Sequence, residues 1–251
     1  MALQISRTGE NLTETVVEAR IIPNPDKARD LWAGMLSPNF EQLGFTYIPV
    51  PQLNIVQQDS SAIKFTLDND NINSSLNLFV NEQMGVRFVI NGLTVSFNCA
   101  QGNYLGWREY RKVLIDVLSV FMKLGIAESY ERLMIRYISE YDFNILDKVK
   151  IEVNPHADCE YQTSEISLSR SDNNVESYIT ISGLKERVSK NRKEKRVTSL
   201  FDVNVFERLK HNPSSIDEIV VSLDNIHEIE KKSFFGLLKE DFIKTIYQEN
   251  K

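Results

Sequence analysis

Residues 103–143 read NYLGWREYRKVLIDVLSVFMKLGIAESYERLMIRYISEYDF, and this stretch decides the fold class. Its first part repeats apolar side chains at the three- and four-residue spacing of one helix face. These apolar residues are Trp107, Tyr110, Val113, Leu114, Val117, Leu118, Phe121 and Leu124. Gly125 follows at the position where a left-handed residue commonly ends a helix. The pattern therefore predicts a long amphipathic helix, followed by a strand over residues 130–141.

Extended runs predominate on both sides of this helix. Before it, alternating segments predict strands over residues 14–22, 45–57, 62–67, 75–80, 86–90 and 93–98, with a short helix over residues 26–36. The pair Asn91-Gly92 predicts a tight hairpin, because both turn positions need positive φ. After the helix, strands are expected over residues 165–169, 175–182 and 198–209. A second long helix begins at the capping-box spacing of Ser215 and Glu218 and ends near Gly236, and a short helix follows over residues 239–247.

A strand, several further strands and a long helix thus occur twice in the same order. The sequence predicts an α+β fold of two similarly ordered halves, residues 1–127 and 128–251. Each half is expected to be a mainly antiparallel sheet covered by one long amphipathic helix. No repeat of individual residues accompanies this order, so the duplication is inferred from architecture alone.

Composition limits the function classes. The chain has 251 residues, of which 42% are hydrophobic and 25% are charged, values that are ordinary for a soluble globular protein. A net charge of −6 argues against a surface-wide nucleic-acid or membrane footprint. No apolar run is long enough to span a membrane, and residues 1–9 lack the apolar core of a secretion signal. We therefore expect a cytoplasmic protein without a membrane partner.

The residue types that usually carry catalysis do not occur in productive spacings. His156, His211 and His227, with Cys99 and Cys159, lack the spacing of a zinc site. His156 and Cys159 lie close together in the sequence, but no turn that could form an oxyanion hole follows them. The glycines are scattered singly, which excludes a phosphate-binding loop. We expect no catalytic residue, no metal ligand and no cofactor.

One segment departs from the acidic character of the chain. Residues 185–196 hold seven basic side chains against Glu186 and Glu194, a local net charge of +5. The candidate binding residues in this basic loop are Lys190, Arg192, Lys193, Lys195 and Arg196. Such a loop suits phosphate, RNA or an acidic partner, and a hairpin loop with solvated lysines is the alternative interpretation. It lacks the aromatic side chains on which nucleic-acid bases commonly stack, so a protein partner is favoured over nucleic acid.

Short motifs spread along the chain resemble a known family. They are the strand Thr15 to Ala19, the spacing Tyr104-x-x-Trp107-x-x-Tyr110, the strand Arg132-x-x-x-Arg136-Tyr137-Ile138, and the late pattern Leu223-x-x-Ile226-His227 with Phe234. This set resembles a sporadically distributed prokaryotic family of about this length that has no assigned function. Residues 147–196 lie outside the resemblance. The patchy distribution of that family implies an accessory or anti-phage defence role.

Three functional hypotheses remain open. The first is a non-enzymatic interaction protein that uses the basic loop as its contact surface. The second is a module that binds a small molecule in a pocket between the sheet and the helix from Trp107 to Leu124. The third is an enzyme whose site is assembled from dispersed residues. The sequence does not indicate an oligomeric state.

Overall fold

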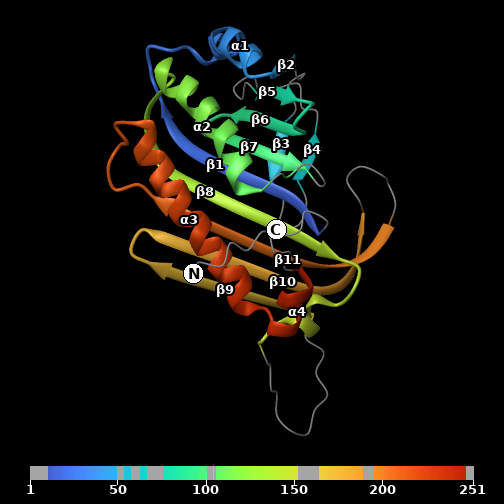
Figure 1. Cartoon of the computed structure of the whole chain (residues 1–251). Coiled ribbons are helices and arrows are strands. Elements are labelled where there is room, and N and C mark those ends of the chain that lie inside the picture. Colours follow the sequence, from blue (N-terminus) through green and yellow to red (C-terminus); the bar gives the residue numbers. More distant parts are fainter. Residues whose placement is uncertain are drawn as a thin grey trace, which may run out of the picture.

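The computed structural model describes residues 11–49, 54–57, 63–66, 76–100, 104, 106–151, 164–188 and 195–246. These residues form an α+β fold built on one large antiparallel sheet (Figure 1). The sheet has nine strands in the order β2-β5-β6-β7-β1-β8-β11-β10-β9, and β3 and β4 form a separate two-stranded sheet.

The elements have the following bounds. The strands are β1 (Leu12–Pro23), β2 (Thr46–Pro49), β3 (Asn54–Gln57), β4 (Ile63–Thr66), β5 (Leu76–Asn81), β6 (Val86–Asn91), β7 (Thr94–Ala100), β8 (Ala127–Tyr141), β9 (Glu165–Asp172), β10 (Val175–Val188) and β11 (Lys195–Arg208). The helices are α1 (Trp32–Gln42), α2 (Trp107–Lys123), α3 (Ile216–Leu237) and α4 (Glu240–Ile246), with the short 3-10 helices η1 (Arg29–Leu31) and η2 (Ile145–Lys148).

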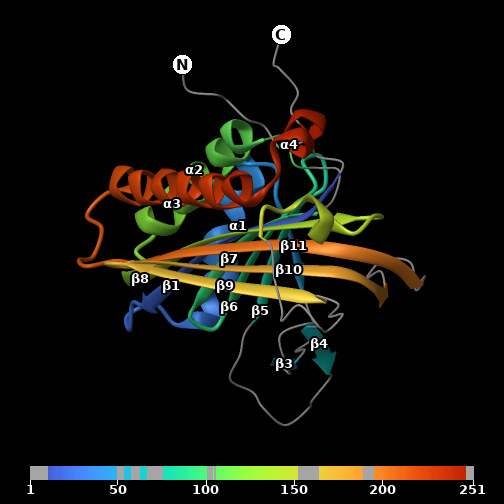
Figure 2. The same ribbon diagram turned by 90° about the horizontal axis from the view of Figure 1, so that it is seen from below.

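The helices cover one face of the large sheet. Figure 2 shows α1, α2, α3 and α4 on one side, whereas β3 and β4 lie on the other. We call the sheet face away from α2 and α3 the open face. Alternation along β8 explains the division, because successive side chains of a strand point to opposite faces. Leu133, Ile135 and Tyr137 are buried on the helix side, whereas Arg132 and Arg136 are partly exposed on the open face.

Aromatic rings fill the space between the helices and β5 to β7. Phe40 of α1 contacts Phe79 and Phe88, with ring centroids 4.8 and 5.1 Å apart. Phe88 also contacts Phe121 of α2, and Phe121 meets Trp32 of α1 edge to face. All five side chains are almost completely buried. This cluster joins α1 and α2 to the sheet.

Comparison with the expected fold gives one confirmation and two differences. The α+β class with antiparallel strands is confirmed. The separate sheets expected for residues 1–127 and 128–251 are one sheet, because β1 pairs with β7 on one side and with β8 on the other. The helix expected over residues 26–36 instead runs from Trp32 to Gln42 and contains Pro38. Burial of Trp32, Leu36 and Phe40 on one side of α1 sustains the helix past the proline, which lacks an N–H for the helical hydrogen bond.

The aromatic cluster generates a stability prediction. Replacing Phe88→Ala removes a ring that contacts β5, α1 and α2, and should lower the free energy of unfolding by about 3–5 kcal/mol. The matched control is Leu31→Ala, because Leu31 is 58% exposed and its loss should change stability by less than about 0.5 kcal/mol. Urea unfolding of both variants measures the difference. Equal effects of the two substitutions would contradict the assigned core.

Candidate functional site

The described residues of the predicted basic loop, 185–188 and 195–196, are not a loop but belong to strands β10 and β11, in a two-stranded extension of the sheet. Pairing of β11 with β8 ends at Ser199 and Tyr141, and pairing of β10 with β9 ends at Ser182 and Glu165. Strands β10 and β11 continue beyond these points, to the pair of Val188 with Lys195. We call residues 183–188 and 195–198 the ribbon. Figure 1 shows it projecting past the ends of the neighbouring strands.

A bulge at Gly183 directs the ribbon away from the sheet. The register of β10 with β11 shifts between Ser182 and Lys185, which leaves one extra residue on β10. A Cβ atom on Gly183 would lie 3.1 Å from a methyl carbon of Leu146 and 3.2 Å from Oδ1 of Asn144. The Gly183 N–H donates to the carbonyl oxygen of Ser164 at 2.9 Å. A larger residue at this bulge would therefore force the side chains of Leu146 and Asn144 to shift by a few tenths of an ångström.

The described part of the ribbon exposes apolar and charged side chains together. Leu184 is 46% exposed and Val197 is 58% exposed. Lys185 donates to Glu165 at 3.0 Å, an exposed ion pair at the base of the ribbon. Large exposed aliphatic side chains at a projecting end of a sheet are typical of a contact surface.

The structure accounts for only part of the predicted binding set. Arg196 is exposed on β11 within the ribbon. Lys195 pairs through its backbone register with Val188, and its side chain lies outside the described atoms. Lys190, Arg192 and Lys193 lie outside the described residues, as do His156 and Cys159. The sequence analysis found this segment from its charge but missed Leu184, Val197 and the bulge.

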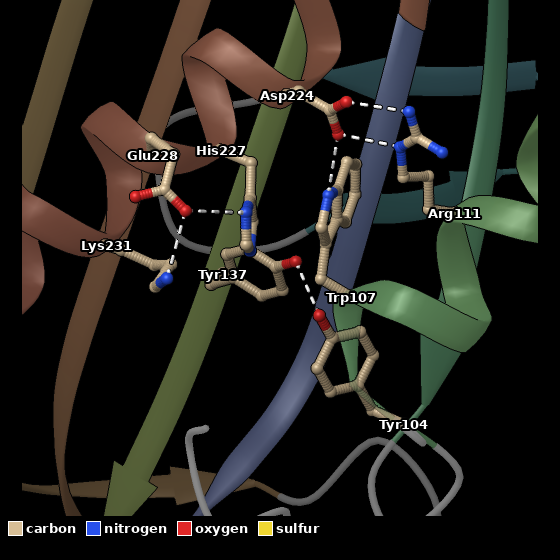
Figure 3. Close-up of polar contacts among 8 residues, drawn as sticks. All are labelled: Tyr104, Trp107, Arg111, Tyr137, Asp224, His227, Glu228 and Lys231. Carbon is tan, nitrogen blue, oxygen red and sulfur yellow. Dashed lines mark hydrogen bonds and ion pairs between the residues drawn. The ribbon is translucent and has the colours of Figure 1, made fainter. Parts of the chain in front are cut away.

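A second site lies where α2 meets α3 above β8 (Figure 3). Trp107 of α2 stacks on His227 of α3, with ring centroids 4.3 Å apart and planes 11° from parallel. Tyr137 of β8 meets His227 at 6.0 Å and Tyr104 at 5.6 Å between centroids. Tyr104 also contacts Tyr110. We call these five residues the ring cluster, and all five belong to the motifs singled out in the sequence.

An ion pair with an additional tryptophan hydrogen bond joins the two helices beside the ring cluster. Asp224 of α3 accepts hydrogen bonds from Nε and Nη2 of Arg111, both at 2.7 Å, and from Nε1 of Trp107 at 3.0 Å. These contacts with Asp224 raise the pKa of Arg111, chiefly through the hydrogen bond. The planar two-bond geometry fixes the orientation of the guanidinium as well as its charge. Asp224 therefore connects the first turns of α2 to the middle of α3.

Tyr110 and Tyr137 of the ring cluster stay neutral at physiological pH. Burial raises the pKa values of Tyr110 and Tyr137 well above the ordinary value of a phenol. The Tyr110 hydroxyl donates to the carbonyl oxygen of Phe97 at 2.8 Å, and the hydroxyls of Tyr104 and Tyr137 are 2.8 Å apart. Nδ1 of His227 is 4.0 Å from a carboxylate oxygen of Glu228, beyond hydrogen-bonding distance. These contacts suit a structural junction better than proton transfer.

Ion pairs on the open face tie β8 to both of its neighbours. Arg132 donates to Glu18 of β1 at 2.9 Å. Arg136 donates to both carboxylate oxygens of Asp202 on β11, at 2.9 and 2.6 Å. The Asp202 side chain is only 16% exposed and is held by Arg136. The guanidinium of Arg132 also lies over the Phe206 ring, 5.2 Å from its centroid.

The cavity and the side chains of the described residues give little support for a bound small molecule or metal ion. A cavity between α2 and the sheet measures about 10 Å³, enough for about one water molecule. Val17, Ala19, Leu114 and Leu118 are among its apolar walls. Within the described ranges, no three His, Cys, Asp or Glu side chains gather closely enough to hold a metal ion. In the same ranges, every helix is too short or too polar to cross a membrane.

Comparison with known proteins adds no further assignment. No protein-family model and no curated protein matches the sequence of this chain.

The junction of α2 and α3 generates a second prediction. In a double-mutant cycle, Arg111→Ala and Asp224→Ala should show a coupling energy of about 1 kcal/mol that falls as salt is added, because both side chains are partly exposed. Urea unfolding of the two single variants and the double variant gives this value.

The control cycle uses Lys112 and Glu109, an exposed pair within α2. Its coupling should be smaller, since Lys112 donates to both carboxylate oxygens from a single nitrogen and the pair has no tryptophan donor like that of Asp224. A coupling between Arg111 and Asp224 no larger than that of the control pair would contradict their role in joining the helices.

Proposed function

We propose that this protein is a non-enzymatic interaction protein and that the ribbon is its contact surface for a protein partner. The observation that carries the proposal is the exposure of Leu184 and Val197 on strands that have left the sheet. A ribbon that served only to connect β10 with β11 would gain nothing from large aliphatic side chains in water. Burying them against a partner would remove that apolar surface from water.

A protein partner fits the ribbon better than nucleic acid does. Residues 183–198 contain no aromatic side chain on which a base could stack. Exposed aliphatic side chains contribute to the apolar centre of protein interfaces, whereas basic side chains around them favour an acidic partner. The net charge of −6 over the whole chain would repel nucleic acid from the remaining surface.

The order of elements supports the proposal that the chain consists of two similarly ordered halves, residues 1–127 and 128–251. In the first, β7 lies beside β1 and leads into α2. In the second, β11 lies beside β8 and leads into α3. We further propose that the protein belongs to the sporadic prokaryotic family its motifs resemble and acts in the cytoplasm in an accessory or anti-phage defence system. Convergence of Tyr104, Trp107, Tyr137 and His227 at one junction supports treating those motifs as a unit.

The two other hypotheses have less support. The cavity beneath α2 is far smaller than the several hundred cubic ångströms of a typical ligand pocket. An enzyme would need a nucleophile, an acid–base group or clustered ligands in reach of one another. The ring cluster contains the phenols of Tyr110 and Tyr137, which burial holds neutral, and the His227 imidazole stacked on Trp107, and the buried carboxyl group of Glu230 acts on Tyr137. Both remain alternatives to the interaction protein.

The test uses the tagged full chain expressed in its native cell. The double variant Leu184→Asp with Val197→Asp should lose a stoichiometric protein partner that the unchanged chain retains, because each carboxylate would enter the apolar centre of the interface. The matched control is Val221→Asp on α3, where an equally apolar side chain is 68% exposed far along the sequence from the ribbon. Quantitative mass spectrometry of the purified complexes measures retention.

Retention of the partner by the ribbon variant, or its loss in the Val221 control, would refute the ribbon as the contact surface. Tight, salt-sensitive binding of a labelled RNA or DNA oligonucleotide by the purified chain would instead favour nucleic acid as the partner. A small molecule retained in native mass spectrometry would favour the ligand-binding alternative.

A further inference from the structure

The two edges of the nine-stranded sheet differ in how they are protected. Strand β2 at one edge has four residues and ends at Pro49, and short length and proline both discourage pairing with another chain. Strand β9 at the other edge has eight residues, contains no proline and pairs with β10 without a bulge. It has the form of a strand that accepts a further strand.

The backbone groups that point off this edge can be identified from the pairing. The Gly183 N–H donates to the carbonyl of Ser164, one residue before the pair of Glu165 with Ser182. In an antiparallel ladder, hydrogen-bonded and non-hydrogen-bonded pairs alternate. The N–H and C=O groups of Ile166 and Leu168 therefore face β10. Those of Glu165, Ser167, Ser169 and Ser171 face away from the sheet, and the described residues provide no partner strand for them.

The side chains of β9 suit a second copy of the same strand. Ile166 and Leu168 stand opposite Ile181 and Ile179, so they share the helix face of the sheet, where both are half-buried against the edge of the core. A two-fold axis perpendicular to the sheet would keep the helices of both copies on the same side. It would also bring the apolar edges of the two cores together.

We propose that β9 pairs antiparallel with β9 of a second copy of this chain, with Leu168 opposite the partner's Leu168. In this register, Ser167 and the partner's Ser169 exchange N–H···O bonds, as do Glu165 and the partner's Ser171. The two Leu168 side chains form a non-hydrogen-bonded pair, the arrangement in which side chains approach most closely. No like charges stand opposite each other.

The register centred on Leu168 pairs the seven residues from Glu165 to Ser171 and places Arg170 opposite the partner's Ile166. Sliding the strands by two residues toward Asp172 places Arg170 opposite the partner's Leu168 and Asp172 opposite the partner's Ile166, and sliding further places the two Arg170 side chains opposite each other, which is unfavourable. Sliding by two residues the other way places Ile166 opposite the partner's Leu168 but shortens the overlap within β9 to residues 165–169.

Sedimentation analysis of the full chain over a wide range of concentration provides the first test. The unchanged chain should be a dimer that dissociates on dilution. Ser169→Pro should be monomeric and still folded, because the N–H that proline removes points off the edge and makes no bond to β10. Ser169→Ala is the matched control and should remain a dimer. A monomeric unchanged chain, or a dimeric Ser169→Pro variant that keeps its circular dichroism spectrum, would overturn the proposal.

Disulfide cross-linking tests the register. In a Cys159→Ser background, Leu168→Cys should form a covalent dimer under mild oxidation, since Cα atoms in such a pair are within the range that a disulfide spans. Ser169→Cys in the same background should not form a covalent dimer. In this register Ser169 stands opposite the partner's Ser167, so the two introduced cysteines are offset by two residues along the paired strands. The remaining Cys99 is buried. Failure of Leu168→Cys to cross-link, or equal cross-linking of Ser169→Cys, would reject the pairing centred on Leu168.

Discussion

The backbone pairing of β1 with β8 is the constraint on which the rest of the structure depends. It runs from Leu12 opposite Ser139 to Pro23 opposite Ala127, along almost the whole length of both strands. Each strand pairs on its other side with the last strand of a meander, β7 beside β1 and β11 beside β8. Without the central pairing, the sheet would divide into two pieces with two long exposed edges, each a template for aggregation.

Contacts on both faces of the sheet follow from that pairing. On the open face, Arg132 reaches Glu18 and Arg136 reaches Asp202, so β8 is tied to β1 and to β11 by side chains as well as by backbone. On the helix face, a continuous sheet brings α2 and α3 side by side, where Arg111 and Asp224 join them. The ring cluster fills the angle between the two helices and β8. The ribbon carries two of the exposed large apolar side chains, Leu184 and Val197, whereas Ile166 and Leu168 of β9 are half-buried.

The sequence predicted features that depend on local periodicity. The spacing from Trp107 to Leu124 predicted α2 almost to its observed ends. Asn91-Gly92 located the hairpin between β6 and β7, but Asn91 pairs with Thr94, so the turn positions are Gly92 and Leu93, and Gly92 has the positive φ. Ser215 and Glu218 predicted the start of α3, where the Ser215 side chain accepts from the Glu218 N–H. The pairing of β1 with β8 was not predicted. Backbone hydrogen bonds between strands do not depend on residue type, and the two strands are more than one hundred positions apart in the sequence. Helix α1 was expected over residues 26–36 but runs from Trp32 to Gln42, because burial of one side of the helix outweighs the cost of Pro38.

The candidate site was predictable to a similar extent. Charge alone identified the basic segment 185–196, whose described residues lie in the ribbon. Spacing identified Tyr104, Trp107 and Tyr110 of the ring cluster. Their convergence with Tyr137 and His227 required the three-dimensional arrangement of α2, β8 and α3. The spacing of His227 argued against a zinc site, and its stacking on Trp107 could not be read from the sequence. The bulge at Gly183 could have been suspected from an isolated glycine within a strand pattern.

Native-state hydrogen exchange tests the central pairing most directly. If β1 and β8 hold the sheet together, their amide protons should exchange only through global unfolding, with the same free energy as those of β7 and β11. That free energy should equal the value from urea unfolding. Exchange of β1 and β8 amides at a markedly lower free energy than the amides of β7 and β11 would contradict the account, because the sheet would then open at its centre while the flanking meanders stayed folded.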